Sequence, residues 1–139
     1  MAEAGPTKTS YSIELGESYA NRGMARVRAG QPAEAAADLR RALELWAKAP
    51  LIDIEPRVER SRSLALLAGL DGDAKSGVTA AEAKLFADQS VAALTDVVKL
   101  GWALSSELQE PDFDMLRGRP DFQKLLVEVE ARAKHPAEK

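Results

Sequence analysis

Apolar and small residues recur four positions apart between residues 10 and 29, and this spacing predicts a helix with one apolar face. That face is formed by Tyr11, Leu15, Tyr19, Gly23 and Val27. A second helix is predicted over residues 33–47, because one of its faces gathers a similar set. The second set is Ala35, Leu39, Ala42, Leu43 and Trp46.

The link between these helices is short and contains residues that suit a reversal of the chain. Gly30 stands where a left-handed residue commonly ends a helix, and Pro32 stands where a proline commonly begins one. A link of this length makes the two helices antiparallel. The small residues that let the two backbones approach closely are Gly23, Ala35 and Ala42. The pattern therefore predicts a helical hairpin over residues 10–48.

The pattern between residues 56 and 100 predicts a second hairpin, which is a diverged copy of the first with a longer loop. Its helices are expected over residues 56–70 and 80–100. Residues 64–69 repeat the pattern of residues 25–30 but are more apolar. We therefore expect the third helix to be the more deeply buried one. The second hairpin spans residues 56–100.

The last part of the chain predicts a lid. Pro-Asp-Phe occurs twice, at Pro111–Phe113 and Pro120–Phe122, and each proline can begin a helical turn. We expect a fifth major helix over residues 120–133, within a cap over residues 107–133. The apolar residues of the cap are Phe113, Leu116, Phe122, Leu125, Leu126 and Val129. An open helical stack needs such a lid, because its last hairpin otherwise leaves one face in water.

The small-residue spacing of the first hairpin resembles that of a tetratricopeptide (TPR) repeat. The segments Leu64–Leu70, Gly77–Glu82, Asp114–Arg117 and Arg119–Phe122 resemble the TPR-like tail that follows the catalytic domain in bacterial, planctomycete-type serine/threonine kinases. This resemblance implies an all-α fold of the α-solenoid type, with two TPR-like hairpins and a C-terminal capping helix. Two positions depart from the TPR pattern: Arg26 replaces an aromatic residue, and Ala47 replaces a proline.

One domain over residues 10–133 is expected, with a disordered segment 1–9 and a frayed segment 134–139. The TPR resemblance implies a protein-interaction module, regulatory and kinase-associated, that binds a protein or peptide partner through its concave face. The first helix of each TPR hairpin lines that face. The implied binding residues are Glu17, Asn21, Met24, Arg28, Glu59, Arg60 and Ser63. Their arginines favour an acidic peptide, and a solvated charged face is the alternative.

A structural function is a second hypothesis. Two hairpins are fewer than the roughly three repeats that such stacks usually need, so a homodimer would complete the stack. A third hypothesis is a calcium-binding loop over residues 71–82, with oxygen ligands from Asp71, Asp73, Thr79 and Glu82. Lys75 and Ser76 oppose calcium, because they replace an oxygen ligand and a turn glycine. We favour a capping box between Thr79 and Glu82 instead.

Composition excludes other classes of function. The net charge of the 139-residue chain is −3 and no basic run occurs, so nucleic acid is not an expected ligand. The chain has no cysteine and no long apolar run, so disulfides, thiol chemistry and a membrane span are excluded, and a cytoplasmic location is expected. We expect no cofactor.

No enzymatic activity is expected either. The chain has no Gly-rich phosphate loop, no His-Arg-Asp and no Asp-Phe-Gly, which a kinase requires. The only histidine, His135, lies in the predicted frayed tail. Trp46 and Trp102 follow matching helices, where they are either core residues or an interface patch, and we favour the core.

Overall fold

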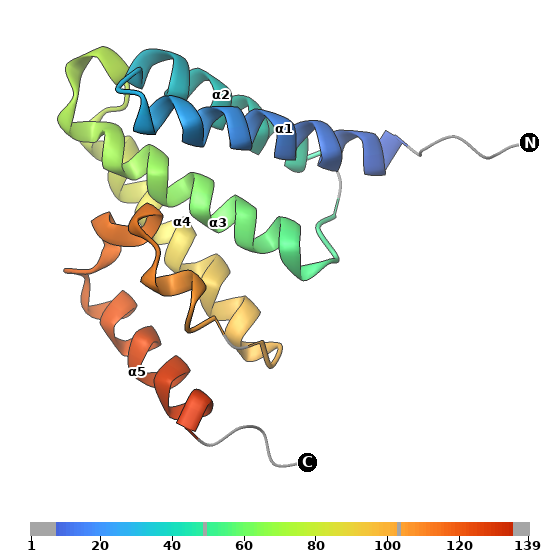
Figure 1. Cartoon of the computed structure of the whole chain (residues 1–139), viewed down its shortest axis with the longest axis vertical. Coiled ribbons are helices and arrows are strands. Elements are labelled where there is room, and N and C mark those ends of the chain that lie inside the picture. The colour runs from blue at the N-terminus through green and yellow to red at the C-terminus, as the bar shows by residue number, and fades with distance from the viewer. Residues whose placement is uncertain (1–7, 49, 103, 135–139) are drawn as a thin grey trace, which may run out of the picture.

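The fold is described by a computed structural model that covers residues 8–48, 50–102 and 104–134. These residues form helices and connecting segments without any strand, which confirms the all-α prediction. The α-helices are α1 (Lys8–Arg28), α2 (Pro32–Trp46), α3 (Ile54–Gly69), α4 (Ala80–Lys99) and α5 (Pro120–Lys134) (Figure 1). Short 3-10 turns lie at Leu70–Gly72, Ala74–Ser76, Glu107–Gln109 and Pro111–Leu116.

Each predicted helix is present, with ends within about two residues of the expected ones. α1 begins at Lys8, within the segment that the sequence assigned to the disordered N-terminus. The remainder of that segment, residues 1–7, lies outside the described residues. Of the predicted frayed tail 134–139, Lys134 ends α5, whereas His135 and residues 136–139 lie outside the described residues. None of the described helices combines the length and the apolar character that crossing a bilayer requires.

Helices α1 and α2 run side by side as an antiparallel pair (Figure 1). The reversal uses the predicted residues: Gly30 has a φ of 75°, and Pro32 is the first residue of α2. The amide of Gly30 donates to the Val27 carbonyl and the amide of Gln31 donates to the Arg26 carbonyl, at 3.2 and 2.9 Å. These bonds satisfy carbonyls that the end of α1 would otherwise leave free.

The two helices touch where the sequence predicted a close approach. A Cβ atom added to Gly23 would lie 2.8 Å from Cγ of Leu39, and Ala35 and Ala42 are fully buried. The buried face of α1 differs from the predicted stripe, because Gly16 and Ala20 are buried whereas Tyr11 is 58% exposed. The contact between α1 and α2 is therefore formed by the residues of α1 that have the smallest side chains.

Helix α3 occupies the centre of the fold, and residues 61–68 are all buried. It pairs with α4, and it also packs against α1, α2 and the turn Pro111–Leu116. Ser90 on α4 donates from Oγ to the carbonyl of Ser61 at 2.8 Å, and both residues are fully buried. The expectation of a deeply buried third helix is confirmed, because neighbours cover α3 on several sides.

The predicted lid is present. Its residues Phe113, Leu116, Phe122, Leu125 and Val129 are buried in the main core, and Leu126 packs against that core. The turn Pro111–Leu116 supplies Phe113 and Leu116, and α5 supplies the others. The C-terminal segment thus covers the outer side of the α3–α4 pair (Figure 1).

Candidate functional site

The structure divides the seven predicted binding residues among different surroundings. Glu17 and Asn21 on α1 line one hollow together with Glu55 and Glu59 on α3. Three of the seven predicted residues are therefore brought together, and two of those three are carboxylates. This part of the surface is acidic, and the arginines expected to bind an acidic peptide do not line it.

The other four predicted residues do not join this hollow. Ser63 is 1% exposed and is therefore closed to a ligand, and Met24 is partly buried against the core. Arg28 pairs with Asp112 at 3.4 Å. Arg60 lines a separate cleft on another face of α3, because a helix turns by about 100° per residue and separates it from Glu59. The seven residues therefore do not line one hollow in the structure.

A larger hollow of about 910 Å³ adjoins the first and shares Glu55 and Glu59 with it. It lies between the start of α3 and residues 102 and 104–110. We call the two hollows together the acidic groove. Its charged residues are Glu17, Asp53, Glu55, Glu59, Glu107, Glu110 and Arg62. Six carboxylates and one guanidinium give a formal charge of −5, more negative than the −3 of the whole chain.

The carboxylates of the acidic groove repel one another. Burial raises the pKa of the Glu17 carboxyl above its ordinary value, and the charges of Glu59, Glu55 and Glu14 raise it further. A cation placed among these groups would relieve this repulsion.

Arg62 holds the two walls of the acidic groove together. It is 8% exposed, and its guanidinium contacts Glu59 on its own helix and Glu110 across the groove, each at 2.5 Å. Nε lies 3.2 Å from Asp112, and the guanidinium carbon lies 5.8 Å from the ring centre of Phe113. Because Arg62 is engaged in these contacts, it positions the segment 107–112 against α3 and leaves most of the acidic charge uncompensated.

Exposed apolar side chains lie beside this charge. Ile52 is 77% exposed and Trp102 is 53% exposed, and both line the larger hollow. The expectation of a core position is confirmed for Trp46, which is 2% exposed, and is wrong for Trp102. Gly101, with a φ of 97°, ends the α4 region immediately before Trp102 and turns the chain away from the helix axis. The sequence signal that could have found Ile52 was an apolar side chain in a loop next to Asp53, whereas Trp102 has no acidic residue closer in sequence than Glu107.

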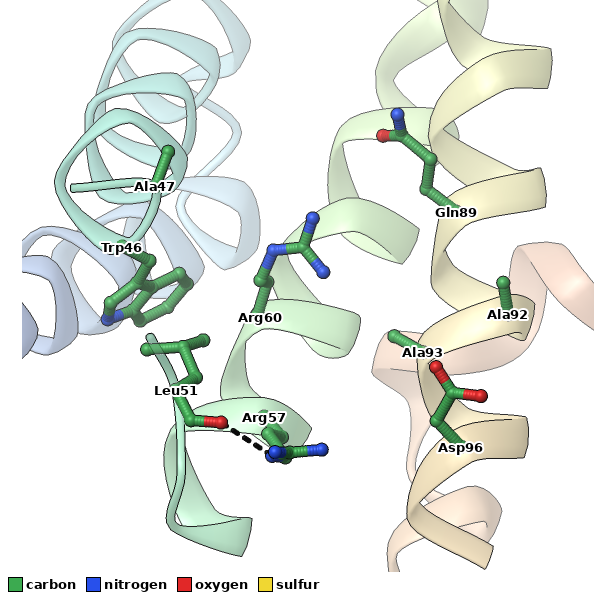
Figure 2. Close-up of a pocket in the computed structure, with 9 residues that line it drawn as sticks. All are labelled: Trp46, Ala47, Leu51, Arg57, Arg60, Gln89, Ala92, Ala93 and Asp96. Atoms are coloured by element: carbon green, nitrogen blue, oxygen red, sulfur yellow. Dashed lines mark hydrogen bonds between the residues drawn. The ribbon is translucent and has the colours of Figure 1, made fainter. Parts of the chain in front are cut away.

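A second concavity lies on the opposite face of α3 and is shown in Figure 2. It is a cleft of about 470 Å³ between the end of α2, the residue Leu51, α3 and α4. We call it the arginine cleft, because Arg57 and Arg60 of α3 stand in it and Asp96 of α4 faces them (Figure 2). Nε of Arg57 donates to the Leu51 carbonyl at 2.6 Å. Of these residues, sequence reasoning had selected only Arg60.

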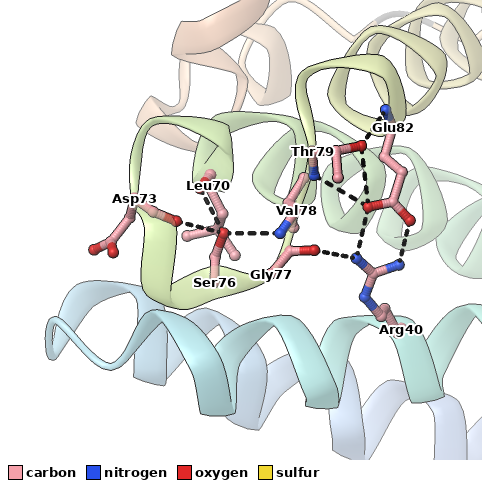
Figure 3. Close-up of polar contacts among 8 residues, drawn as sticks. All are labelled: Arg40, Leu70, Asp73, Ser76, Gly77, Val78, Thr79 and Glu82. Atoms are coloured by element: carbon pink, nitrogen blue, oxygen red, sulfur yellow. Dashed lines mark hydrogen bonds and ion pairs between the residues drawn. The ribbon is translucent and has the colours of Figure 1, made fainter.

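The calcium-like loop is organised by internal hydrogen bonds (Figure 3). The predicted capping box is confirmed: Oγ1 of Thr79 accepts from the Glu82 amide, and the Glu82 carboxylate accepts from the Thr79 amide, both at 3.1 Å. Arg40 of α2 donates to both Glu82 oxygens at 3.2 Å. Ser76 donates from Oγ to the carbonyls of Leu70 and Asp73.

Three of the four predicted calcium ligands, Asp73, Thr79 and Glu82, thus form hydrogen bonds within the protein. The Asp73 carboxylate accepts from the Lys75 amide at 2.9 Å, and the Glu82 carboxylate is held by Arg40. Within residues 8–48, 50–102 and 104–134, no three acidic, histidine or cysteine side chains are grouped in a way that would hold a metal ion. Arg40 therefore joins α2 to this loop and to the first turn of α4.

Comparison with known proteins adds no relative to this picture. No protein-family model matches the chain, and no match is found among curated proteins or solved structures. The TPR assignment and the kinase-tail resemblance therefore stay predictions.

Proposed function

We propose that this chain is a protein-interaction module, built as a TPR-like scaffold, that binds a basic segment of a partner protein in the acidic groove. The observation that supports this most directly is the position of exposed Ile52 and Trp102 within a groove of charge −5. Exposed aromatic residues in a concave, charged surface are typical of protein-binding sites. The proposal assigns the chain no catalytic role.

Charge and shape together describe the bound segment. Lysine or arginine side chains would pair with Glu17, Glu55 and Glu107, which lie along the groove. An apolar side chain between them would contact Ile52 and Trp102. The bound segment is therefore basic with at least one large apolar residue, which reverses the charge of the peptide that the sequence suggested.

The TPR-like and kinase-associated parts of the proposal are supported by residues rather than by relatives. Two antiparallel helix pairs follow one another, and small residues lie at the contact between α1 and α2, as in TPR hairpins. The kinase association depends on the motif Arg119–Phe122 and its preceding segments. A kinase catalytic domain encoded directly before this chain would support a regulatory, cytoplasmic role.

A displayed library of random peptides, selected on the full chain, tests the proposal. We expect the selected peptides to be basic with a large apolar residue, and to lose at least about tenfold in affinity on Trp102→Ser or Ile52→Ser. Leu85→Ser is the matched control, because Leu85 is 54% exposed but lies outside the groove. Selected peptides that bind all three variants equally would contradict the proposed site.

Self-association is the competing function, since the same apolar residues would suit a second copy of the chain. Light scattering distinguishes the two. A monomer across the accessible concentration range supports the partner-binding module. A dimer that Trp102→Ser dissociates would instead make the groove a homodimer interface and the chain a structural domain.

A further inference from the structure

The arginine cleft lies apart from the acidic groove. On α3, residues 57 and 60 point to one side, and residues 55, 59 and 62 point to the other, because the helix has 3.6 residues per turn. Its volume of about 470 Å³ falls within the range of small-molecule sites, roughly 300–1,000 Å³. On the α4 wall the side chains of Ala92 and Ala93 end at Cβ, which leaves the cleft open (Figure 2).

One wall of the cleft provides cationic donors. Arg60 extends between α2 and α4 (Figure 2), and within the described part of the chain it forms no hydrogen bond or ion pair. Arg57 is fixed by its bond from Nε to the Leu51 carbonyl, and its terminal nitrogens remain directed into the cleft. A guanidinium presents paired N–H groups in a plane, the geometry that a carboxylate accepts.

The opposite wall carries the opposite charge. Asp96 stands on α4, across the cleft from the two arginines (Figure 2), and no ion pair joins it to either of them in the residues that the structure describes. Gln89, from the same helix, adds an amide. A simple dianion such as phosphate would be repelled by Asp96, and a simple cation would be repelled by the arginines. A ligand with both charges satisfies both walls.

We propose that the arginine cleft binds a small zwitterion of the amino-acid class. Arg60 and Arg57 bind its carboxylate, and Asp96 binds its ammonium group. Leu51 and Ala92 offer an apolar surface for its side chain. This site is independent of partner binding in the acidic groove, so either proposal can fail without the other.

Nuclear magnetic resonance titration of the full chain with three matched probes tests the proposal. L-leucine carries both charges, N-acetyl-L-leucine lacks the ammonium group, and L-leucinamide lacks the carboxylate. We expect leucine to shift the amide signals of Gln89, Ala92 and Ala93. Each derivative should bind at least about tenfold more weakly, because it loses a charge-assisted hydrogen bond.

Single substitutions test which residue of the cleft binds the carboxylate of leucine and which binds its ammonium group. Arg60→Gln should weaken the binding of leucine by about tenfold or more. Asp96→Asn should weaken the binding of leucine but not that of N-acetyl-L-leucine, which has no ammonium group for Asp96 to bind. Ala93→Leu fills the cleft without a change of charge and should abolish the shifts. Arg41→Gln is the control, because Arg41 lies on the exposed face of α2 and pairs with Glu44.

Two outcomes would overturn the proposal. If leucine shifts no amide signal up to its solubility limit, the cleft is not an amino-acid site. If N-acetyl-L-leucine or L-leucinamide binds as tightly as leucine, the cleft does not recognise a zwitterion. A circular dichroism melt of each variant separates loss of binding from loss of fold.

Discussion

The indole of Trp46 packs directly on the backbone of Gly16, so that a Cβ atom at residue 16 would lie 2.6 Å from the indole Nε1. The same Nε1 donates to the carbonyl of Ile13 at 3.2 Å. The end of α2 is therefore joined to α1 by a contact that no side chain at residue 16 would allow. Trp46 and Ala20 belong to a small core between these helices.

Gly16→Ala tests this contact. Alanine favours a helix over glycine by about 0.5–1 kcal/mol, but the clash with Trp46 outweighs this gain, so we expect a net loss of about 1–3 kcal/mol in the free energy of unfolding. Urea denaturation measures the change. Gly69→Ala is the control, because its Cβ atom would meet Met115 at an ordinary 3.8 Å, and it should not destabilise the fold. Equal effects at both glycines would show that Trp46 does not pack as described.

Asp38 connects α2 to α1 and should make the fold sensitive to acid. Its carboxylate accepts from Nε and Nη2 of Arg22 and from Nη1 of Arg26, each at 2.9 Å. The hydrogen bonds from Arg22, followed by the charges of Arg22 and Arg26, hold the pKa of Asp38 below its ordinary value. Arg26, which departs from the TPR pattern, thereby has a structural role.

The pKa of Asp38 is lower in the folded state than in the unfolded state. The ionised carboxylate therefore stabilises the fold at pH values above the unfolded pKa of about 3.9, and this stabilisation is lost as the pH falls through the folded pKa. We expect Asp38→Asn to cost about 1–3 kcal/mol at pH 7 and to flatten the loss of stability in acid. Denaturation at a series of pH values measures both. Glu44→Gln, at an exposed ion pair, should follow the wild-type pH dependence; an Asp38→Asn curve parallel to wild type would contradict the assignment.

The N-terminus of α4 depends on Thr79, which is the N-cap residue of the capping box. Thr79→Ala removes the acceptor for the Glu82 amide and should lower the free energy of unfolding by about 1 kcal/mol. Thr79→Ser keeps the hydroxyl and should retain most of the stability. Thermal unfolding compares the two variants, and an alanine variant as stable as the serine variant would mean that the cap contributes nothing.

Glu17 is expected to oppose folding at neutral pH. Its raised pKa means that the folded state favours the protonated carboxyl, so this contribution to stability is complete below the unfolded pKa and is lost as the pH rises through the folded pKa. Glu17→Gln should therefore stabilise the fold at pH 7 by a few tenths of a kcal/mol, with no gain near pH 3. Glu130→Gln on α5 is the control. A Glu17→Gln variant that is less stable at pH 7 would show that Glu17 is compensated in the groove.

Local chemistry determined much of this fold. The helix ends followed from Gly30, Pro32 and Thr79, because caps and turns depend on residues a few positions apart. The lid followed from the apolar spacing of Phe113 to Val129, since such side chains bury themselves wherever a surface is offered. The sequence also indicated, from Gly23, where α1 and α2 meet.

The surfaces were decided by tertiary structure alone. Glu59 and Arg60 are adjacent in sequence, yet the rotation of α3 places one in the acidic groove and the other in the arginine cleft. Glu17, Glu59 and Glu107 gather from three distant segments, and Trp102 is exposed because the chain turns away after Gly101. Charge is set residue by residue along the chain, whereas the field that a ligand meets depends on distances between segments, which exist only after the helices have packed.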